Sequence, residues 1–527
     1  MTGVVVCPQV GAAEVGGGVL RAGGNAIDAA VATAFVQGVI DPPMAGLGGF
    51  GVLVCAMERG SAAGMSFSSC AGGRVRPEQW LARAGSRLAD GYGYGVEGLA
   101  NDIGYESVAV PGMVDGLGRA HARWGSLPWA VLLEPAIALA AEGFDVTHAV
   151  HDFWMELAQP GRAGGLERMT ATPAAASLFA PHGALLEIGA RCVQPELGRT
   201  LEVLAARGHR EFYDGEIADA IARDLAEHGG HVTREDLASY RATEFDPLST
   251  GYRRWRVLGA PPPSGGVMIA QMLRRLERHD LHAAGHNTPE AISLIVEAMR
   301  AAVASRAQVG ADPDAVSPDL DAVLAGSARD AAAPPAAASP PRESADTTHV
   351  TIVDGEDRVV ALTHSLGMGS GVVTPGLGFI YNNYMNGFNP HPGHVDSIAP
   401  GKRRGSSMAP TIILDEDGAA RLAVGAPGAT RITTAVLHSI VNVLDHGLTA
   451  VEAVSAPRID CQGGAIEVEP RIPTWVSNAL REQGYEVNRT QLNYDPYFAR
   501  AQLVVRQGAH WIGASDPRRD GGAALYA

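Results

Sequence analysis

An alanine- and proline-rich segment divides this chain into two unequal regions. Residues 331–341 read Ala-Ala-Ala-Pro-Pro-Ala-Ala-Ala-Ser-Pro-Pro. The prolines remove backbone donors and interrupt any helix or strand, and the small side chains bury little apolar surface. We therefore predict a flexible surface linker over residues 325–346, which ends a large region at residues 1–346 and precedes a small region at residues 347–527. A plain tether between two domains is the alternative that composition alone favours.

The two regions differ in their sequence patterns. Upstream of the linker, apolar and alanine-rich runs predict helices at residues 24–35, 128–142, 215–228 and 289–306. Downstream, short β-rich runs separated by glycine-containing turns predict strands at residues 350–353, 359–363, 411–414 and 421–424, with one helix at residues 433–444. The sum is a mixed α/β or α+β architecture in which helical layers cover sheet.

The first two downstream strands are predicted to pair as a hairpin. When their apolar side chains share a face, Val350 lies opposite Leu362 and Ile352 lies opposite Val360. This register leaves an acidic turn between the strands.

The hairpin register has a consequence for the end of the linker. If the pairing continues, Thr347 lies opposite Ser365, with β-carbons about 4.5–5.5 Å apart. A two-residue Asp-Gly turn at residues 354–355 is the competing arrangement. It would pair Ile352 with Asp357, so the register that joins the two hydroxyls is preferred. A simple strand-capping role for Ser365 is the alternative.

Thr347 is the candidate nucleophile. Cleavage between Asp346 and Thr347 would create an N-terminal threonine with a hydroxyl nucleophile and an α-amino base, whose reference pKa is about 7.7–8.0. A glycine-containing turn at residues 425–430 follows one predicted strand and precedes a helix. Backbone N–H groups of Gly428 and Ala429 could therefore hold an oxyanion, although a plain strand-to-helix turn has the same pattern.

Composition disfavours several function classes. The formal net charge of −16 and the lack of a basic run argue against a nucleic-acid partner. No apolar run approaches the roughly 20 residues that span a bilayer, the N-terminus lacks a secretory pattern, and the five cysteines are scattered without a Cys-x-x-Cys pair. We expect a cytoplasmic protein with a small-molecule substrate and no membrane partner.

Two motif matches lack the context that they need. The Gly-x-Gly-x-x-Gly pattern at residues 46–51 has no preceding strand and no following acid, so it predicts close backbone packing and not a dinucleotide site. Histidine pairs at residues 148 and 151 and at residues 391 and 394 lack a zinc-binding arrangement. We therefore expect no metal and no cofactor.

Nine short motifs follow one another along nearly the whole chain. They are residues 23–30 (Gly-Gly-Asn-Ala-Ile-Asp-Ala-Ala), 46–50 (Gly-Leu-Gly-Gly-Phe), 110–112 (Val-Pro-Gly), 263–266 (Pro-Ser-Gly-Gly), 347–349 (Thr-Thr-His), 382–383 (Asn-Asn), 401–403 (Gly-Lys-Arg), 406–411 (Ser-Ser-Met-Ala-Pro-Thr) and 427–428 (Pro-Gly). In this order they resemble the γ-glutamyltranspeptidase family.

The resemblance implies a fold and a mechanism. The fold is a four-layer αββα sandwich of the N-terminal-nucleophile hydrolase type, made as a precursor (a zymogen) that cuts itself before Thr347. The large and small fragments would stay together as a heterodimer, alone or as a dimer of such pairs. Gly428 and Ala429 would hold the oxyanion, although the family has glycine at the second position. Ser365 falls on the family threonine that hydrogen-bonds the nucleophile.

The positions that read the substrate depart from the family pattern. The arginine that grips the α-carboxylate of the γ-glutamyl donor falls on Ser68. The asparagine, glutamine and aspartate that hold its α-amino group fall on Gly367, Tyr384 and Gly387. An amino acid zwitterion would be left largely unpaired, at a cost of several kcal/mol as an order of magnitude.

A few substrate-binding candidates remain. Ser406 and Ser407 match the family's carboxylate-binding pair, and Asn383 belongs to a matching motif. Arg403 and Arg74 could substitute as anion partners, with surface placement the alternative for Arg74. The pocket is expected to be open and not to select γ-glutamate.

These observations leave four functions in order of preference. The first is an acylase or amidohydrolase that acts through an acyl-enzyme on a non-glutathione substrate, by hydrolysis or transfer. The second is a carbon–carbon bond hydrolase of antibiotic biosynthesis, of the alkylproline type. The third is a γ-glutamyltransferase that acts on glutathione, and the fourth is an unprocessed scaffold without activity.

Overall fold

A seven-stranded antiparallel sheet lies at the centre of the molecule. The computed structural model describes residues 3–88, 93–316, 318–327, 347–519 and 521–526. In order across the sheet, the strands are β20 (Gly522–Tyr526), β1 (Gly3–Cys7), β11 (Thr348–Val353), β12 (Val359–Ser365), β2 (Phe50–Glu58), β3 (Ser61–Phe67) and β8 (Thr243–Phe245). The predicted hairpin therefore forms the middle of this sheet.

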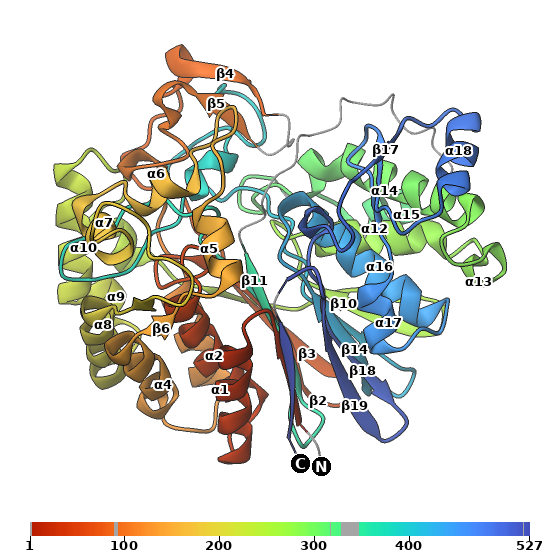
Figure 1. Ribbon diagram of the computed structural model, residues 1–527, viewed down its shortest axis with the longest axis horizontal. Coiled ribbons are helices and arrows are strands. Elements are labelled where there is room, and N and C mark those ends of the chain that lie inside the picture. Colours follow the sequence, from red (N-terminus) through yellow and green to blue (C-terminus); the bar gives the residue numbers. More distant parts are fainter. Residues whose placement is uncertain (1–2, 89–92, 317, 328–346, 520, 527) are drawn as a thin grey trace.

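A second, six-stranded sheet packs against the first face to face (Figure 1). Its strands in order are β19 (His510–Ser515), β18 (Gln502–Gln507), β14 (Ala420–Gly425), β13 (Thr411–Leu414), β10 (Trp255–Gly259) and β9 (Leu248–Tyr252). Both sheets combine strands from the two sides of the predicted linker. The two regions consequently form one folded body and not two separate domains.

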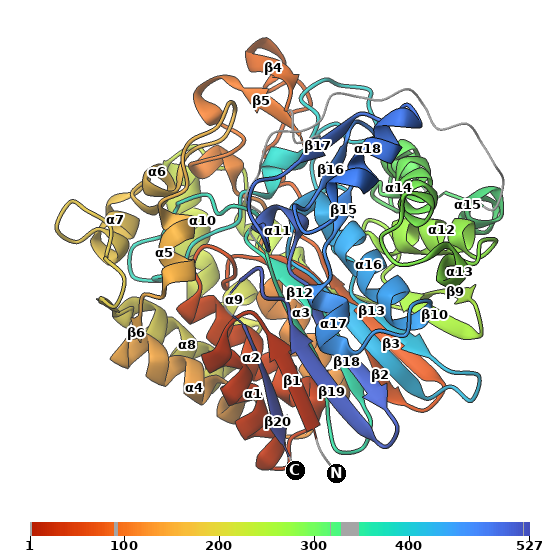
Figure 2. The same ribbon diagram turned by 45° about the vertical axis from the view of Figure 1, so that its right-hand side comes forward.

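Helices cover the outer face of each sheet (Figures 1 and 2). The first sheet is covered by α1 (Val10–Arg21) and α2 (Ala26–Ile40), with α4 (Trp129–Glu142) and α8 (Pro195–Arg207) outside them. The second sheet is covered by α12 (Gly266–Leu276), α14 (Pro289–Val309) and α16 (Ile432–Leu444). The predicted αββα sandwich is confirmed. No helix among the described residues is long and apolar enough to cross a bilayer.

The alanine-rich helix α2 packs between the sheet and the outer helices. Its N-cap Asn25 accepts from the amide of Asp28, and the Asp28 carboxylate accepts from the amide of Asn25 in return. Small side chains allow α1 to approach closely, since a β-carbon on Gly16 would lie 2.4 Å from the hydroxyl oxygen of Thr33. The helix is therefore both capped locally and fixed by packing on both sides.

The predicted elements agree with the structure except at the linker. The predicted helices correspond to α2, α4, α10 (Glu216–Glu227), α14 and α16. The predicted start of the linker at residue 325 is wrong, because α15 (Leu320–Ser327) continues through residues 325–327. The rest of the predicted linker, including Asp346, lies outside the described residues.

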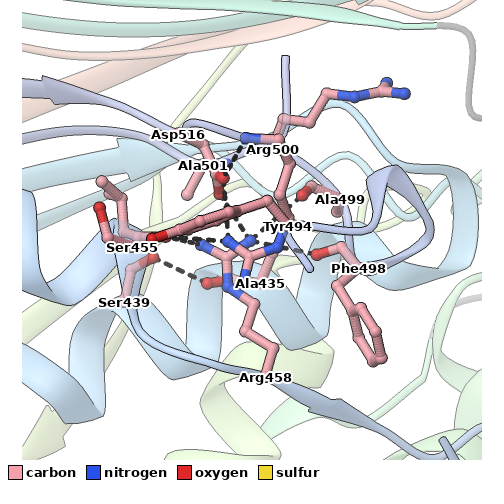
Figure 3. A network of polar contacts seen from close by, with 12 residues as sticks. Ala435, Ser439, Ser455, Arg458, Tyr494, Phe498, Ala499, Arg500, Ala501 and Asp516 are labelled. Atoms are coloured by element: carbon pink, nitrogen blue, oxygen red, sulfur yellow. Dashed lines mark hydrogen bonds and ion pairs between the residues drawn. The ribbon is translucent and has the colours of Figure 1, made fainter. Parts of the chain in front are cut away.

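A buried cluster of ion pairs lies beside the second sheet (Figure 3). Arg458 and Arg518 both contact the carboxylate of Asp516, at 2.6 and 2.9 Å, and Arg518 also contacts Glu469 at 2.6 Å. Burial raises the pKa of Asp516, but the two guanidinium charges outweigh burial and hold that pKa below its ordinary value. Arg458 also donates to the carbonyl oxygens of Phe498 and Ala499.

We predict that Arg458→Met lowers the free energy of unfolding by about 3–5 kcal/mol, because it leaves a buried carboxylate short of a cation. Arg191→Met is the control, since the pair between Arg191 and Asp145 is exposed and should contribute less than about 1 kcal/mol. Urea unfolding would measure both in a Thr347→Ala chain, which lacks the predicted nucleophile and is expected to stay whole. Equal losses in the two variants would contradict the prediction.

Candidate active site

The hairpin register is the one predicted from the sequence. Val350 pairs with Leu362 and Ile352 pairs with Val360 in the antiparallel ladder between β11 and β12. Because side chains alternate along a strand, this pairing decides which residues face the second sheet and which face helix α2.

Thr347 and Ser365 meet at the open end of this hairpin. The hydroxyl of Thr347 donates to the Ser365 hydroxyl oxygen over 3.1 Å, and both residues are buried. The amide of Gly367 donates to the same Ser365 oxygen over 2.8 Å, which orients the serine. The predicted nucleophile therefore has a second hydroxyl within hydrogen-bond distance.

The candidate oxyanion loop follows β14. Gly428 and Ala429 have φ angles of +150° and +46°, and Ala429 begins a 3-10 turn that leads into α16. The first amides of a helix have no intrahelical acceptor, so this turn offers N–H groups for an oxyanion. A β-carbon on Gly428 would lie 2.2 Å from the β-carbon of Ala499, so the close approach requires glycine here.

The ion-pair cluster supports this loop from behind. The Arg458 guanidinium holds the carbonyl oxygens of Phe498 and Ala499, as Figure 3 shows. The next residue, Arg500, donates its amide to the carbonyl oxygen of Pro427 over 3.1 Å. One short segment therefore connects the buried charges to the turn that holds Ala429.

We expect Gly428→Ala to reduce turnover at least about tenfold, because its methyl group would displace the loop by contact with Ala499. Ala499→Gly should restore part of the loss, since it removes the contacting methyl and has a φ of +60° that suits glycine. Steady-state kinetics on the two single variants and the double variant would measure the coupling. Additive losses would show that the two methyl groups do not meet.

Two buried histidines lie on opposite faces of the hairpin. His349 faces the second sheet, where its ring lies against Gly425 and contacts the hydroxyls of Thr363 and Thr351 at 2.8 and 2.9 Å. His364 faces α2 and contacts an amide oxygen there. Burial lowers the pKa of each to about 3, with a further contribution to His349 from the charge of His364. Both rings are therefore neutral near pH 7.

A polar network lies behind the nucleophile, on the α2 face. The Thr348 hydroxyl accepts from the side-chain amides of Gln9 and Gln37 at 3.1 and 3.0 Å. The side-chain oxygen of Gln37 in turn accepts from Nε2 of His364 over 2.8 Å. These contacts tie the residue next to Thr347 to the first two helices. The sequence motifs included Thr348, but gave no signal for its glutamine partners.

The low pKa values predict a loss of stability in acid. His364 titrates near pH 3 when folded and near pH 6.5 when unfolded, so below pH 6.5 the unfolded chain binds a proton that the folded chain does not. The free energy of unfolding should therefore fall as pH drops from about 6.5, by up to about 1.4 kcal/mol per pH unit for each such histidine. His364→Gln should make this slope shallower by about one proton in urea unfolding at pH 5–7. An unchanged slope would contradict the assignment.

A pocket opens beside the hydroxyl pair. Its lining residues are Phe50, Arg162, Thr347, Ser365, Gly367, Met368, Asn386, Arg404, Ser406, Ser407, Met408, Ala429 and Ile432. Thr347, Ser365 and Ala429 are thus brought together with the substrate candidates Gly367, Ser406 and Ser407.

Two other candidates lie directly behind the pocket wall. The Asn383 side chain accepts from the amide of Met368 over 2.9 Å. The Tyr384 hydroxyl accepts from the backbone amide of Arg404 over 3.1 Å. Both residues are fully buried and shape the pocket through residues that line it.

The structure does not bring Ser68 and Arg403 to this pocket, which corrects the prediction. Both line a different cavity, together with Asp236. Arg403 is held by the carboxylate of Asp312 at 2.8 Å, and it also pairs with Asp314. Its guanidinium is therefore paired with carboxylates that do not line the Thr347 pocket.

Two arginines that line the Thr347 pocket were not predicted from the sequence. Arg74 is exposed, as its alternative interpretation expected, whereas Arg404 is buried and lines the Thr347 pocket with Arg162. Arg404 lies two residues before Ser406, a spacing that returns to the same face of an extended chain. That spacing could have identified it. Arg162 had no comparable signal.

The glycine-rich run at residues 46–51 serves close packing, as predicted. A β-carbon on Gly48 would lie 2.4 Å from the carbonyl oxygen of Ile380, and one on Gly49 would lie 2.6 Å from that of Ser365. The run therefore lets the chain pass directly beside the end of β12.

The four-layer fold and the threonine site define a class of protein. It is the class of N-terminal-nucleophile hydrolases and acyltransferases. The chain belongs to the γ-glutamyltranspeptidase family, whose model matches residues 12–526.

Several relatives resemble the chain over almost its whole length. It is 38% identical to the acylase ACY 1 proenzyme of Pseudomonas sp. (strain V22), over 93% of this chain and 88% of the relative. It is 32% identical to the glutathione hydrolase proenzyme of Escherichia coli (strain K12), over 98% and 90%. The crystal structure of cephalosporin acylase from Bacillus halodurans superposes with a TM-score of 0.88 and 27% identity, over 99% of this chain and 95% of that one.

Proposed function

We propose that this protein is a self-processing acylase with Thr347 as its nucleophile. The observation that carries the proposal is the 3.1 Å contact between the hydroxyls of Thr347 and Ser365, at a pocket directly after the predicted cleavage point. Attack of the Thr347 hydroxyl on the carbonyl carbon of residue 346 would transfer that acyl group from the amide nitrogen to the threonine oxygen, and water would then hydrolyse the ester and free Thr347 as a new N-terminus. The same hydroxyl would then attack the acyl carbonyl of an amide substrate.

The proposed reaction uses groups that lie around this threonine. The freed α-amino group of Thr347 takes the hydroxyl proton as the oxygen attacks, and gives it to the departing amine. N–H groups of Gly428 and Ala429 stabilise the oxyanion, and Ser365 orients the nucleophile. Water, or a second amine, then attacks the acyl-enzyme and restores the threonine.

The two fragments are proposed to stay associated after cleavage. Strand β1 of the large fragment lies between β20 and β11 of the small one, and β2 pairs with β12. Separation would expose these strand edges and the buried faces of both sheets. A heterodimer is the expected product, and a cytoplasmic location and a role in antibiotic biosynthesis remain predictions from the sequence.

A substrate other than glutathione is supported by the pocket. Its described lining has no carboxylate that could hold an α-amino group, and Ser68 lies elsewhere. The likeness to a protein named acylase supports an amide substrate with a different acyl group. Glutathione hydrolases are also relatives, so γ-glutamyl transfer is the competing activity to measure.

We predict that the purified 54.8 kDa chain resolves into fragments of residues 1–346 and 347–527 on a denaturing gel, and that Thr347→Ala remains whole. Ser365→Ala should slow the appearance of the fragments by about 10- to 100-fold, because the nucleophile loses a hydrogen-bond partner. Ser365→Thr keeps the hydroxyl and serves as the matched control. Wild-type protein that stays intact after prolonged incubation would exclude this function.

A further inference from the structure

A chain of hydrogen bonds behind Thr347 ends at a buried carboxylate. Asp41 is the C-cap residue of α2, and 1% of it is exposed. The side-chain amide of Gln9 donates to one oxygen of Asp41. The same amide donates to the Thr348 hydroxyl oxygen over 3.1 Å. Asp41 is therefore connected through a single side chain to the residue that follows the proposed nucleophile.

The carboxylate fixes the direction of this chain. A carboxylate accepts hydrogen bonds and does not donate them, so Gln9 turns its NH2 group toward Asp41 and its oxygen away from it. That oxygen accepts from the side-chain amide of Gln37 over 2.7 Å and from the Thr348 hydroxyl over 3.2 Å. The oxygen of Gln37 then faces His364, from which it accepts over 2.8 Å. Each amide is thus oriented by the group before it, and the first is oriented by Asp41.

Arg519 holds this carboxylate from the other side. Its Nη2 donates to both oxygens of Asp41, over 2.8 and 2.7 Å, and 4% of its side chain is exposed. The guanidinium offsets the cost of burying the aspartate. A negative charge at the C-terminal end of a helix is nevertheless unfavourable, so stability alone does not explain why α2 ends in an aspartate.

The His364 ring agrees with this direction. Burial lowers its pKa to about 3, so the ring is neutral near pH 7 and carries one hydrogen. Because Nε2 donates to Gln37, Nδ1 is the nitrogen without a hydrogen. Within the part of the chain that the structure describes, Nδ1 of His364 has no hydrogen-bond partner. No acceptor is therefore present there for a hydrogen on Nδ1.

The position of Thr347 depends on Thr348. The ladder between β11 and β12 begins with the pair of Thr348 and His364, so Thr347 lies one residue beyond it. After the proposed cleavage, Thr347 would be bonded to the protein through Thr348 alone. Since side chains alternate along a strand, a Thr348 hydroxyl that is held on the α2 face directs the Thr347 side chain to the pocket on the opposite face.

We propose that Asp41 is a positioning residue for Thr347, because it orients the hydrogen bonds that hold Thr348. Asp41 is not among the described residues that line the Thr347 pocket, so it acts through Gln9 and Thr348 and does not contact a substrate. The inference rests on the proposed function, since the position of Thr347 affects catalysis only if Thr347 is the nucleophile.

Asp41→Asn tests the role in catalysis, because asparagine has the same shape but can turn either an oxygen or an NH2 group toward Gln9. We expect the rate of cleavage before Thr347, followed on a denaturing gel after cell-free synthesis, to fall about tenfold or more. Hydrolysis of p-nitrophenyl acetate by the cleaved protein, measured above the rate of Thr347→Ala, should slow to a similar extent. Unchanged rates would overturn the inference.

Asp445→Asn is the matched control. Asp445 is the C-cap residue of α16, 4% of its side chain is exposed, and it pairs with Arg253 at 2.9 Å. It therefore shares the burial, helix position and arginine partner of Asp41, but it lies at the end of α16 away from Ala429. Asp445→Asn should lower the thermal stability and leave both rates unchanged. Equal slowing in the two variants would show that the loss is a general effect of removing a buried charge.

The His364 ring reports the direction of the chain without reference to activity. In protein with isotope-labelled histidine, NMR shifts of the ring nitrogens show which one carries the hydrogen, and the signals that disappear in His364→Gln identify this ring. We expect the hydrogen on Nε2 in the wild type, and on Nδ1 in part of the Asp41→Asn molecules, because the two glutamines can then turn over together. A wild-type hydrogen on Nδ1, or identical spectra for the two proteins, would overturn the inference.

A second substitution moves the carboxylate one residue along the chain. In Asp41→Asn with Gln9→Glu, the new carboxylate would accept from Gln37 and Thr348, as the Gln9 oxygen does. This double variant should recover part of both rates and return the hydrogen of His364 to Nε2. A double variant as slow as Asp41→Asn, with the hydrogen still shared between the nitrogens, would contradict the inference.

Two further outcomes separate the possible failures. If Asp41→Asn does not fold, Gln9→Met carries the rate test, because it removes the link between Asp41 and Thr348, and wild-type rates in Gln9→Met would overturn the inference. Wild-type protein that neither cleaves itself nor hydrolyses p-nitrophenyl acetate would exclude the proposed function, and the positioning role with it. A slow Asp41→Asn beside an active wild type supports both.

Discussion

The antiparallel pairing of β11 with β12 is the constraint on which the site depends. It places Thr347 opposite Ser365 at the end of the ladder, between the two sheets. A shift of one residue would turn Thr347 toward α2 and bring Thr348 into the pocket. The apolar pairs along the hairpin and the glutamines that hold Thr348 both oppose such a shift. The position of the nucleophile is thus a consequence of burial on both faces of a central hairpin.

The charged cluster around Asp516 extends this support to the other half of the site. Buried ion pairs are costly to desolvate and contribute little net stability compared with apolar packing. Here Arg458 also satisfies the carbonyl oxygens of Phe498 and Ala499, in the segment that contacts Gly428 and Pro427. The cluster therefore acts mainly by holding this segment in place, because the segment has no regular secondary structure to fix it.

Local patterns were sufficient to predict the framework but not the pocket. The hairpin register, helix α2 and the αββα layers follow from the alternation and apolar runs of contiguous residues. The choice between Arg403 and Arg404 depends on Asp312, about ninety residues earlier in the chain, which captures the first and leaves the second to the pocket. The end of α15 within the predicted linker depends on packing as well. Both features depend on contacts between residues that are far apart in the sequence, and local sequence patterns do not predict such contacts.

The wall of the pocket beside Thr347 is shaped by residues from segments that are far apart in the sequence. In the proposed reaction, the hydroxyl pair and the N–H groups at the helix entrance contact only the reacting atoms of an acyl group. Gly387 and Arg404 fit closely together at this pocket, because a β-carbon on Gly387 would lie 2.2 Å from the Cδ atom of Arg404. The two positions are coupled sterically, because an aspartate at residue 387 could not coexist with Arg404 in its present place. A larger side chain at residue 387 therefore requires Arg404 to move, so the shape of this wall depends on both residues together.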